Sequence, residues 1–455
     1  MKQLLDSKRT AWLLFAAVLP VYVLFPTKNF YWDGIDFAHD IEQAATLTPN
    51  LLHANHLLYS PFGYLVYRLA RWLGADARAV EVLQYANCVL GALCAALLYR
   101  VLLAATRSAY VSLCFSVLFA FSATWWKFTT DAASYTLSTL FLVAAFYYLL
   151  PGRAARPVVV AVLHASAMLF HQIAVFFYPA AVLGLLLQTT QLPPRRRALA
   201  ALRYSAAAVA LTVAVYFYCF KWKTGQTSPL AFLSWVSSYS SGSGGFTFDF
   251  LSNLRYTLRG HVRLFAGGRL TLLEGLLNPF VVALVVILLA LIVLLCWRLA
   301  KSFGRLKTTL RAGDSTRRPS HVELLSVVWM LPFVLFCFFF YPSDTFHRLV
   351  YLPALVILCA AALSRFESGG ARNFRLALFA AALALSNFCF YIYPYAHTRN
   401  NPPLATALGL REIIAPQSVV FFAQSNGDNR LFRYFNPAAE WKQLTAGDLA
   451  ALESE

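Results

Sequence analysis

The sequence has few charged residues. Asp, Glu, Lys and Arg make up 13% of its 455 residues, against about 25% in soluble domains. Hydrophobic residues make up 59%, and the mean hydropathy is +0.59. This composition excludes the polar surface of a soluble domain. It predicts an all-α polytopic membrane protein, because apolar runs such as Phe280–Cys296 and Val322–Tyr341 can cross a hydrocarbon core of about 30 Å, where a helix pairs each backbone amide within its own segment.

Acidic residues are scarcer than basic ones, with 20 against 38, which gives a net charge of +18 at pH 7. Such an excess can indicate nucleic-acid binding. Here the Lys and Arg residues occur in short clusters between apolar runs, as in the cytoplasmic loops of membrane proteins. We therefore expect membrane lipids, and no nucleic acid, as partners.

The polar loops contain no cysteine. All eight cysteines lie in or beside apolar runs, and none forms a CxxC pair. The sequence therefore predicts neither a disulfide framework nor a cysteine metal site.

The apolar runs predict about eleven membrane spans in one transmembrane domain, residues 1–395. The first run lacks a following A-x-A-like cleavage site, so we expect it to remain as a span. The two runs around His171 are short and could be half-helices or one broken helix. The predicted spans are 11–26, 82–105, 109–126, 132–150, 157–170, 172–189, 203–220, 278–297, 321–341, 347–364 and 374–394.

The charges between the spans predict the topology. With the N-terminus in the cytoplasm, each inside loop is basic, from Lys8 and Arg9 to the run Arg298 to Arg318. Most acids, including Glu274, then fall outside, and an odd number of spans places the C-terminus outside as well. The outer face is therefore the one that carries carboxylates.

Three outer segments are long: residues 27–81, 221–278 and 396–455. The first contains Leu57–Leu73, which we expect to be a helix lying in the membrane interface. The second contains the Ser- and Gly-rich stretch Ser237–Gly245, either a flexible loop over a site or a simple linker. The third is a small C-terminal segment with a predicted strand at Ser418–Ala423, and it is too small and polar to hold much core.

Three carboxylates follow the first span. If this stretch is helical, Asp33, Asp36 and Asp40 share one face. They could bind a divalent cation, or one of them could be a general base. An ordinary solvated helix is the simpler interpretation.

Other polar residues are predicted at the same side of the membrane. Asp131 lies where two spans meet, where it could also be a helix cap. His171 interrupts an apolar stretch, and polar residues there are costly and often functional. His347 and Arg348 open a late span, where arginine could bind phosphate or reach lipid headgroups. His53 and His56 precede the predicted interfacial helix.

The order of these parts resembles the GT-C superfamily of membrane glycosyltransferases, in particular bacterial relatives of protein O-mannosyltransferases and of the aminoarabinose transferase of lipid A. The resemblance covers about residues 10–365. Gly34 departs from it, because many members have adjacent acids there, and His171 stands where many have a basic residue. The matching segments are Trp32-Asp33-Gly34-Ile35-Asp36, Asn55-His56-Leu57-Leu58-Tyr59-Ser60-Pro61, Thr130-Asp131, Phe170-His171-Gln172 and Arg348-Leu349-Val350-Tyr351-Leu352-Pro353.

The resemblance implies transfer of a sugar, with inversion, from a polyprenyl-phosphate-linked donor to a lipid, glycan or protein acceptor at the outer face. Asp33 would be the general base, with Asp36 and Asp40 as the alternatives and Asp131 orienting Asp33 or binding the acceptor. Some members require a metal and others do not, so a divalent cation held by Asp33, Asp36 and Asp131 stays open. The donor phosphate would contact Arg348, His347, His171 and Tyr351, and the acceptor side would include Asp40, His53, His56 and Tyr59.

Two other functions fit parts of the pattern. A polysaccharide polymerase or ligase would use outer arginines such as Arg255, Arg259, Arg263 and Arg269. A lipid-linked-sugar flippase or transporter would need acids buried within spans, and a scaffolding protein would leave the acid cluster unexplained. The Ala-, Leu- and Arg-rich composition suggests a GC-rich bacterium, so we expect the inner membrane, with the site facing the periplasm.

Overall fold

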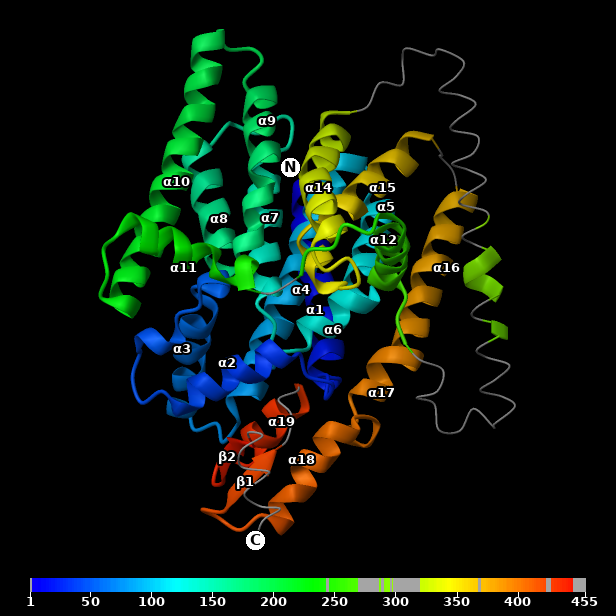
Figure 1. Cartoon of the computed structure of the whole chain (residues 1–455). Helices are drawn as coiled ribbons and strands as arrows, with labels where there is room; N and C mark the ends of the chain where they lie inside the picture. Colours follow the sequence, from blue (N-terminus) through cyan, green and yellow to red (C-terminus); the bar gives the residue numbers. More distant parts are fainter. Residues whose placement is uncertain are drawn as a thin grey trace.

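A computed structural model describes residues 2–242, 245–268, 286–287, 290–294, 297, 320–366, 370–422 and 427–444. These residues are mostly helical (Figure 1). Most of the predicted span 278–297, and also Arg269, Glu274 and the basic run 298–318, lie outside the described residues.

The apolar runs form a helical bundle around α4 (Ala79–Thr106), which packs against α1, α5, α7 and α15. Proline starts α8 and α10 at a position that needs no backbone N–H, and a Ser320–Glu323 capping box starts α14. Each predicted span within the described residues is confirmed as helix, and the chain is broken at His171 as expected. The remaining bundle elements are α1 (Lys2–Leu24), α5 (Ala109–Ala120), α6 (Ala123–Thr129), α7 (Tyr135–Leu149), α8 (Pro157–Phe170), the 3₁₀ segment η3 (Gln172–Phe177), α9 (Tyr178–Gln188), α10 (Pro194–Thr224), α14 (His321–Phe339), α15 (Leu352–Phe366), α16 (Gly370–Asn387), the π segment η7 (Phe388–Ile392) and α17 (Tyr393–Tyr395).

Fewer helices than predicted are long and apolar enough to span a membrane alone. Within the described residues there are four: α4, α10, α14 and the continuous stretch Asn373–Tyr395. The pair α5 and α6 makes a fifth if counted as one broken span. Four shorter apolar helices occupy other predicted spans, so the structure supports a helical membrane protein but not the count of eleven.

The predicted span 109–126 is divided into two helices. The chain bends by 64° between α5 and α6. The Ser122 hydroxyl donates to the Phe119 carbonyl at 2.8 Å, and such a side-chain bond competes with the helical backbone pattern. The bend turns α6 toward the acid-bearing loops.

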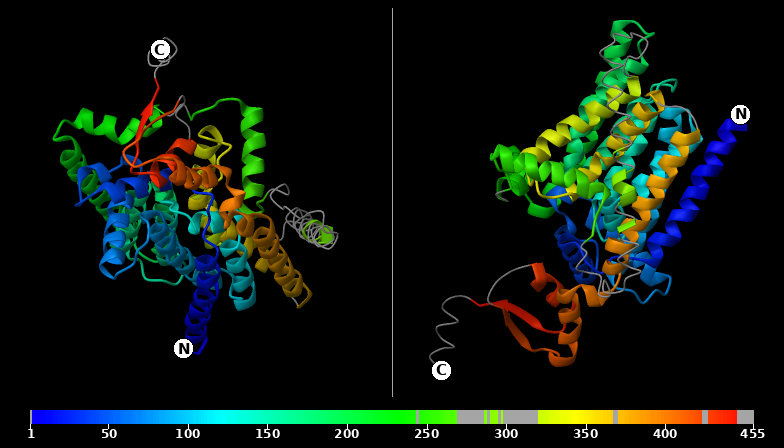
Figure 2. Two further views of the ribbon diagram at one scale, coloured as in Figure 1. Left: turned by 90° about the horizontal axis from the view of Figure 1, so that it is seen from below. Right: turned by 90° about the vertical axis from the view of Figure 1, so that its right-hand side faces the viewer.

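The first outer segment and the C-terminal segment lie at one end of the bundle (Figures 1 and 2). The first contains α2 (Trp32–Gln43), the 3₁₀ turns η1 (Pro49–Leu51) and η2 (Ala54–His56), and α3 (Tyr59–Trp72), which confirms a helix within Leu57–Leu73. The connection between α9 and α10, where the predicted inside arginines 195–197 begin, lies at the opposite end in Figure 1.

The C-terminal segment is more ordered than the sequence suggested. Strand β1 (Val419–Phe422) lies within the predicted strand and pairs in parallel with β2 (Glu440–Gln443). The expectation that the segment holds little core is wrong, because α18 (Pro402–Ile413) and α19 (Gly427–Phe435) add Leu404, Ala407, Leu431, Tyr434 and Phe435 to the main buried cluster. Helix α19 packs directly on α2.

The second outer segment forms two helices, α11 (Pro229–Gly242) and α12 (Phe250–Phe265). The Ser- and Gly-rich stretch is therefore helical as far as Gly242, which corrects the expectation of a flexible loop there. Arg255, Arg259 and Arg263 lie on α12, as their spacing predicted. Figure 1 looks along the axis of α12 and Figure 2 shows its length, so this helix lies across the bundle.

Candidate active site

Two amide side chains of α4 hold the acid-bearing loops together. Gln84 Nε2 donates to the carbonyls of Thr27 and Thr130, at 2.7 and 2.8 Å. Asn87 Nδ2 donates to the carbonyls of Asp131 and Ala133, at 2.7 and 2.9 Å. The loop before α2 and the α6–α7 junction are thereby fixed side by side, although about 100 residues separate them in sequence.

Close packing around position 34 explains why glycine, and not a second acid, follows Asp33. A Cβ at this position would lie 2.4 Å from the Ala132 carbonyl oxygen. Because that oxygen is backbone, only glycine fits this close approach of α2 to the α6–α7 junction.

Asp131 is fully buried and held by three donors. Its Oδ2 accepts from the Tyr31 backbone N at 2.8 Å and from Lys127 Nζ at 2.5 Å. Its Oδ1 accepts from the Ala132 backbone N at 2.8 Å. These bonds make Asp131 an anchor between the two loops, with Lys127 balancing its charge.

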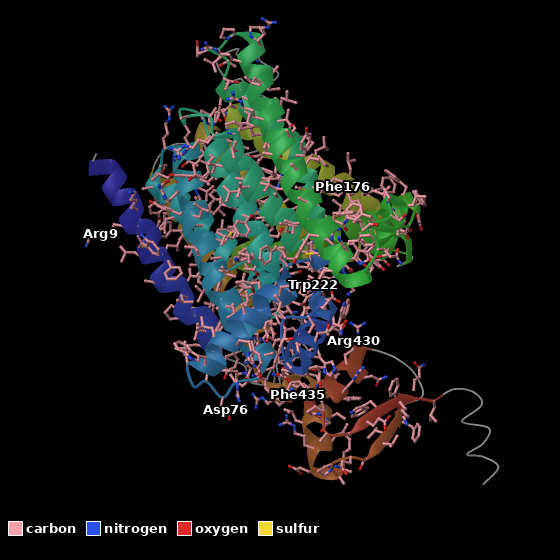
Figure 3. All side chains as sticks on the ribbon, turned by 90° about the vertical axis from the view of Figure 1, so that its left-hand side faces the viewer. Arg9, Asp76, Phe176, Trp222, Arg430 and Phe435 are labelled. Atoms are coloured by element: carbon pink, nitrogen blue, oxygen red, sulfur yellow. The ribbon has the colours of Figure 1, made fainter. Side chains whose placement is uncertain are left out.

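Asp33, Asp36 and Asp40 do share one face of α2. They line a cavity of about 600 Å³, which we call the acid cavity. His53 and His56 line its other side, and Lys223 of α10 and Arg433 of α19 add positive charge. Arg430 Nη1 lies 2.6 Å from Asp36 Oδ2 and 3.9 Å from Asp33 Oδ1, and Figure 3 shows Arg430 on the C-terminal segment where it meets α2.

The acid cavity makes its carboxyls more basic than exposed aspartates. Burial raises the pKa of Asp33, against opposing effects of the Tyr31 hydroxyl and Arg430. Burial raises the pKa of Asp36 to about 6, with Arg430 opposing and Asp33 and Asp40 reinforcing the rise. Burial also raises the pKa of Asp40. Carboxylates with raised pKa values are suited to general-base catalysis near neutral pH.

A second cavity, of about 450 Å³, lies beside the first and is mostly apolar. We call it the apolar cavity. Its lining includes Phe176, Phe336 and Phe340, together with His171 and His347. Both histidines are buried, and within the described part of the chain His171 Nε2 and His347 Nδ1 have no hydrogen-bond partner.

Two imidazoles separate the cavities. His56 lines the acid cavity and His171 the apolar cavity, and their ring centroids are 4.5 Å apart. The neighbour of His56, Asn55, faces the apolar cavity. The ring of Tyr135 continues the row, 4.3 Å from His171 and 6.0 Å from His347.

The other predicted residues of the late segment lie behind the cavity wall. Arg348 is fully buried, and its guanidinium donates to the carbonyls of Asp344 and Pro342. It packs against Gly260 of α12 and holds the 3₁₀ turn η6 (Phe346–Val350), which carries His347. The Tyr351 hydroxyl contacts His261 at 3.1 Å, so neither Arg348 nor Tyr351 lines the two cavities.

Not all of the predicted acceptor-side residues face the acid cavity. Asp40, His53 and His56 line the acid cavity. Tyr59 is buried beneath it, where its hydroxyl accepts from Asn87 Nδ2 at 3.2 Å. It does not face the cavity.

Several residues of the site were not predicted. Lys127 could have been found, because oppositely charged residues four apart often pair. Tyr31 stood in the quoted motif without a role. Lys223, Arg430 and Arg433 reach the acids from distant parts of the chain, and no local sequence signal marks them.

The structure does not bring together the three acids considered as possible metal ligands. Among the residues described, no three His, Cys, Asp or Glu side chains are placed to hold a metal ion. Asp131 is engaged by Lys127 and two backbone amides, and these donors do not fit a cation shared with Asp33 and Asp36.

No protein-family model and no curated protein sequence matches the chain. Two crystal structures of ArnT from Cupriavidus metallidurans are similar to it. The one bound to undecaprenyl phosphate has a TM-score of 0.59 and 14% identity over 98% of this chain and 88% of ArnT. The apo structure has the same TM-score and identity over 97% and 87%. The likeness shows that almost the whole chain has the fold of ArnT, which agrees with the resemblance stated from the sequence.

Proposed function

We propose that this chain is a membrane glycosyltransferase that moves a sugar from a polyprenyl-phosphate-linked donor to an acceptor hydroxyl, with inversion. The fold supports the proposal, because a similar structure was solved with undecaprenyl phosphate bound. Fold alone does not define an activity, so the proposal depends on the site.

The contact between the two cavities is the observation that carries it. A polyprenyl-phosphate sugar has an apolar chain, a charged phosphate and a polar sugar. The apolar cavity suits the part of the polyprenyl chain next to the phosphate, and the acid cavity suits the sugar. The phosphate would then lie near the His56–His171 contact, close to the unpaired nitrogens of His171 and His347.

Asp33 is the general base in this proposal. The acceptor oxygen attacks the anomeric carbon while its proton moves to the Asp33 carboxylate. The bond from that carbon to the phosphate oxygen breaks, and its electron pair stays on the phosphate. Asp33 is preferred over Asp36, which is paired with Arg430, and over Asp131, whose oxygens are occupied.

The departing phosphate gains negative charge and needs donors already in position. His171 and His347 supply two in the apolar cavity. Arg348 supports them by fixing the turn that carries His347. A direct phosphate contact from Arg348 would require its guanidinium to leave two backbone carbonyls.

The acceptor would enter the acid cavity from the end of the bundle that carries α2 and α19. We propose that this end faces the periplasm of a bacterial inner membrane, with the N-terminus in the cytoplasm. Lipid, glycan and protein acceptors all present the hydroxyl that this chemistry needs.

The test is transfer from synthetic polyprenyl-phosphate sugars to an acceptor extract by purified protein. Asp33→Asn should reduce transfer at least about 1,000-fold, near the upper range for general-base catalysis, while the protein still inserts and folds. Asp76→Asn is the control, because Asp76 is exposed and pairs only with Arg71 among the ion pairs described. Wild-type turnover by Asp33→Asn would remove Asp33 as the base, and absence of transfer by the wild type with every donor would refute the function.

A further inference from the structure

Tyr31 connects two of the acids. It precedes α2, and its side chain is buried. Its backbone N donates to Asp131 Oδ2 at 2.8 Å, and its hydroxyl donates to Asp33 Oδ2 at 2.6 Å. One residue therefore links the anchor of the site to the proposed base.

The ring of Tyr31 packs against three other aromatic rings. Phe346, Phe128 and Trp32 have ring centroids 5.2, 5.4 and 5.5 Å from it. The backbone is fixed by Asp131, which Lys127 holds in turn. A short hydrogen bond from so constrained a donor to a carboxylate is among the stronger kinds in proteins, and it costs little side-chain entropy because the ring is already packed.

We infer that Tyr31 is a positioning residue for Asp33: it holds Oδ2 and leaves Oδ1 to receive the acceptor proton. The inference rests on the proposed function for its catalytic meaning. Its geometric content, that the Tyr31 hydroxyl fixes one oxygen of Asp33 and favours the ionised carboxylate, can be tested without any sugar donor.

The hydroxyl opposes the effect of burial on Asp33. Burial favours the protonated acid, whereas a hydrogen bond to the charged form favours the carboxylate. Removal of the hydroxyl should therefore raise the pKa of Asp33. As the pH falls, Asp33 would then become protonated, and stop acting as a base, at a higher pH than in the wild type. The other charged or titratable groups around Asp33 stay in place. They are Asp36, His39 and Asp40 on α2, Arg430 and Arg433 on α19, Lys127 and Asp131 at the α6–α7 junction, Lys223 on α10, and His53 and His56 across the cavity.

The experiment compares wild type, Tyr31→Phe and Tyr64→Phe in nanodiscs. Tyr31→Phe keeps the ring and the backbone N–H. Tyr64→Phe is the matched control. Tyr64 is a buried tyrosine on the neighbouring helix α3, and its hydroxyl donates to the Ala45 carbonyl at 3.0 Å. Each protein is labelled over a range of pH with a hydrophobic carbodiimide, which reacts with protonated carboxyls, and labelling of Asp33 is measured by peptide mass spectrometry.

Tyr31→Phe should shift the midpoint of Asp33 labelling to higher pH by about one unit, while Tyr64→Phe leaves it unchanged. The acidic limb of kcat/KM against pH should shift by the same amount, with most of the rate recovered at high pH. An unchanged labelling midpoint, or an equal rate loss at every pH, would overturn the inference. A shifted midpoint in a protein that shows no transfer would uphold the Tyr31–Asp33 bond and refute the proposed function instead.

Discussion

The ion pair between Lys127 and Asp131 provides the sharpest test of how the site is built. Its side chains are 8% and 0% exposed, and the nitrogen and oxygen are 2.5 Å apart. Lys127→Met keeps the volume of the side chain but leaves the Asp131 carboxylate buried with only two backbone amides. Removing one partner of a buried pair typically costs about 3–5 kcal/mol, because the remaining charge is uncompensated. We expect a loss of free energy of unfolding in this range.

The measurement is unfolding of the purified protein by titration of a denaturing detergent into mixed micelles. The double variant Lys127→Met, Asp131→Asn should recover part of the loss, since it removes the uncompensated charge. The recovery stays partial because the amide offers one acceptor oxygen, whereas the carboxylate accepts from two backbone N–H groups. Arg71→Met is the comparison, because the Arg71–Asp76 pair has side chains that are 48% and 100% exposed, and exposed pairs contribute little. If Lys127→Met cost no more than Arg71→Met, or if the double variant were no better than the single one, Asp131 would not be the charged anchor described above.

Three further predictions follow from the same geometry. Gly34→Ala should destabilise the protein by about 1–3 kcal/mol and lower transfer, because the added Cβ would meet the Ala132 carbonyl. Gly409→Ala on α18 is the control: its Cβ meets nothing within 4 Å, so this variant should be neutral in the same unfolding assay. Asp36→Asn should stabilise the protein most above pH 6. The pKa of Asp36 in the folded protein, about 6, lies above the ordinary value of 3.8, so the wild type loses stability as the pH rises from about 4 to 6. An equal gain in stability at pH 3.5 and pH 8 would contradict this. His171→Ala should raise the KM for the donor with little change in acceptor KM. His397→Ala, which alters a residue that lines neither cavity, should change neither KM; a specific rise in acceptor KM on His171→Ala would contradict donor binding in the apolar cavity.

The sequence predicted the helices well, because their signal is local. Most apolar runs became helices within a few residues of the expected limits, whereas α1 and α10 each begin nine residues earlier than predicted. The spacing of Asp33, Asp36 and Asp40 correctly placed all three on one face. The bend after α5 was not predicted, because the run is apolar on both sides of it; in the structure the Ser122 hydroxyl donates to the Phe119 carbonyl at this bend.

The roles of individual polar residues were less predictable. Arginine donates equally well to a phosphate and to backbone carbonyls, and Arg348 contacts two carbonyls in the structure. His171 was suspected only because it interrupts an apolar stretch, and its relation to His56 depends on how η2 packs against η3. These outcomes are decided by tertiary contacts.

The C-terminal segment shows the same point on a larger scale. The resemblance stated from the sequence covers about residues 10–365, yet the structural likeness covers 98% of the chain. Glu42 explains why the segment belongs to the site: it accepts from Arg78 and from the Tyr434 hydroxyl, while Arg78 also donates to the Tyr434 carbonyl. These bonds fix α19 against α2 and bring Arg430 to Asp36. Because Arg430 opposes the burial-driven rise in the pKa of both Asp33 and Asp36, the charge of the acid cavity depends on a residue almost 400 positions away, and the C-terminal segment is part of the candidate active site.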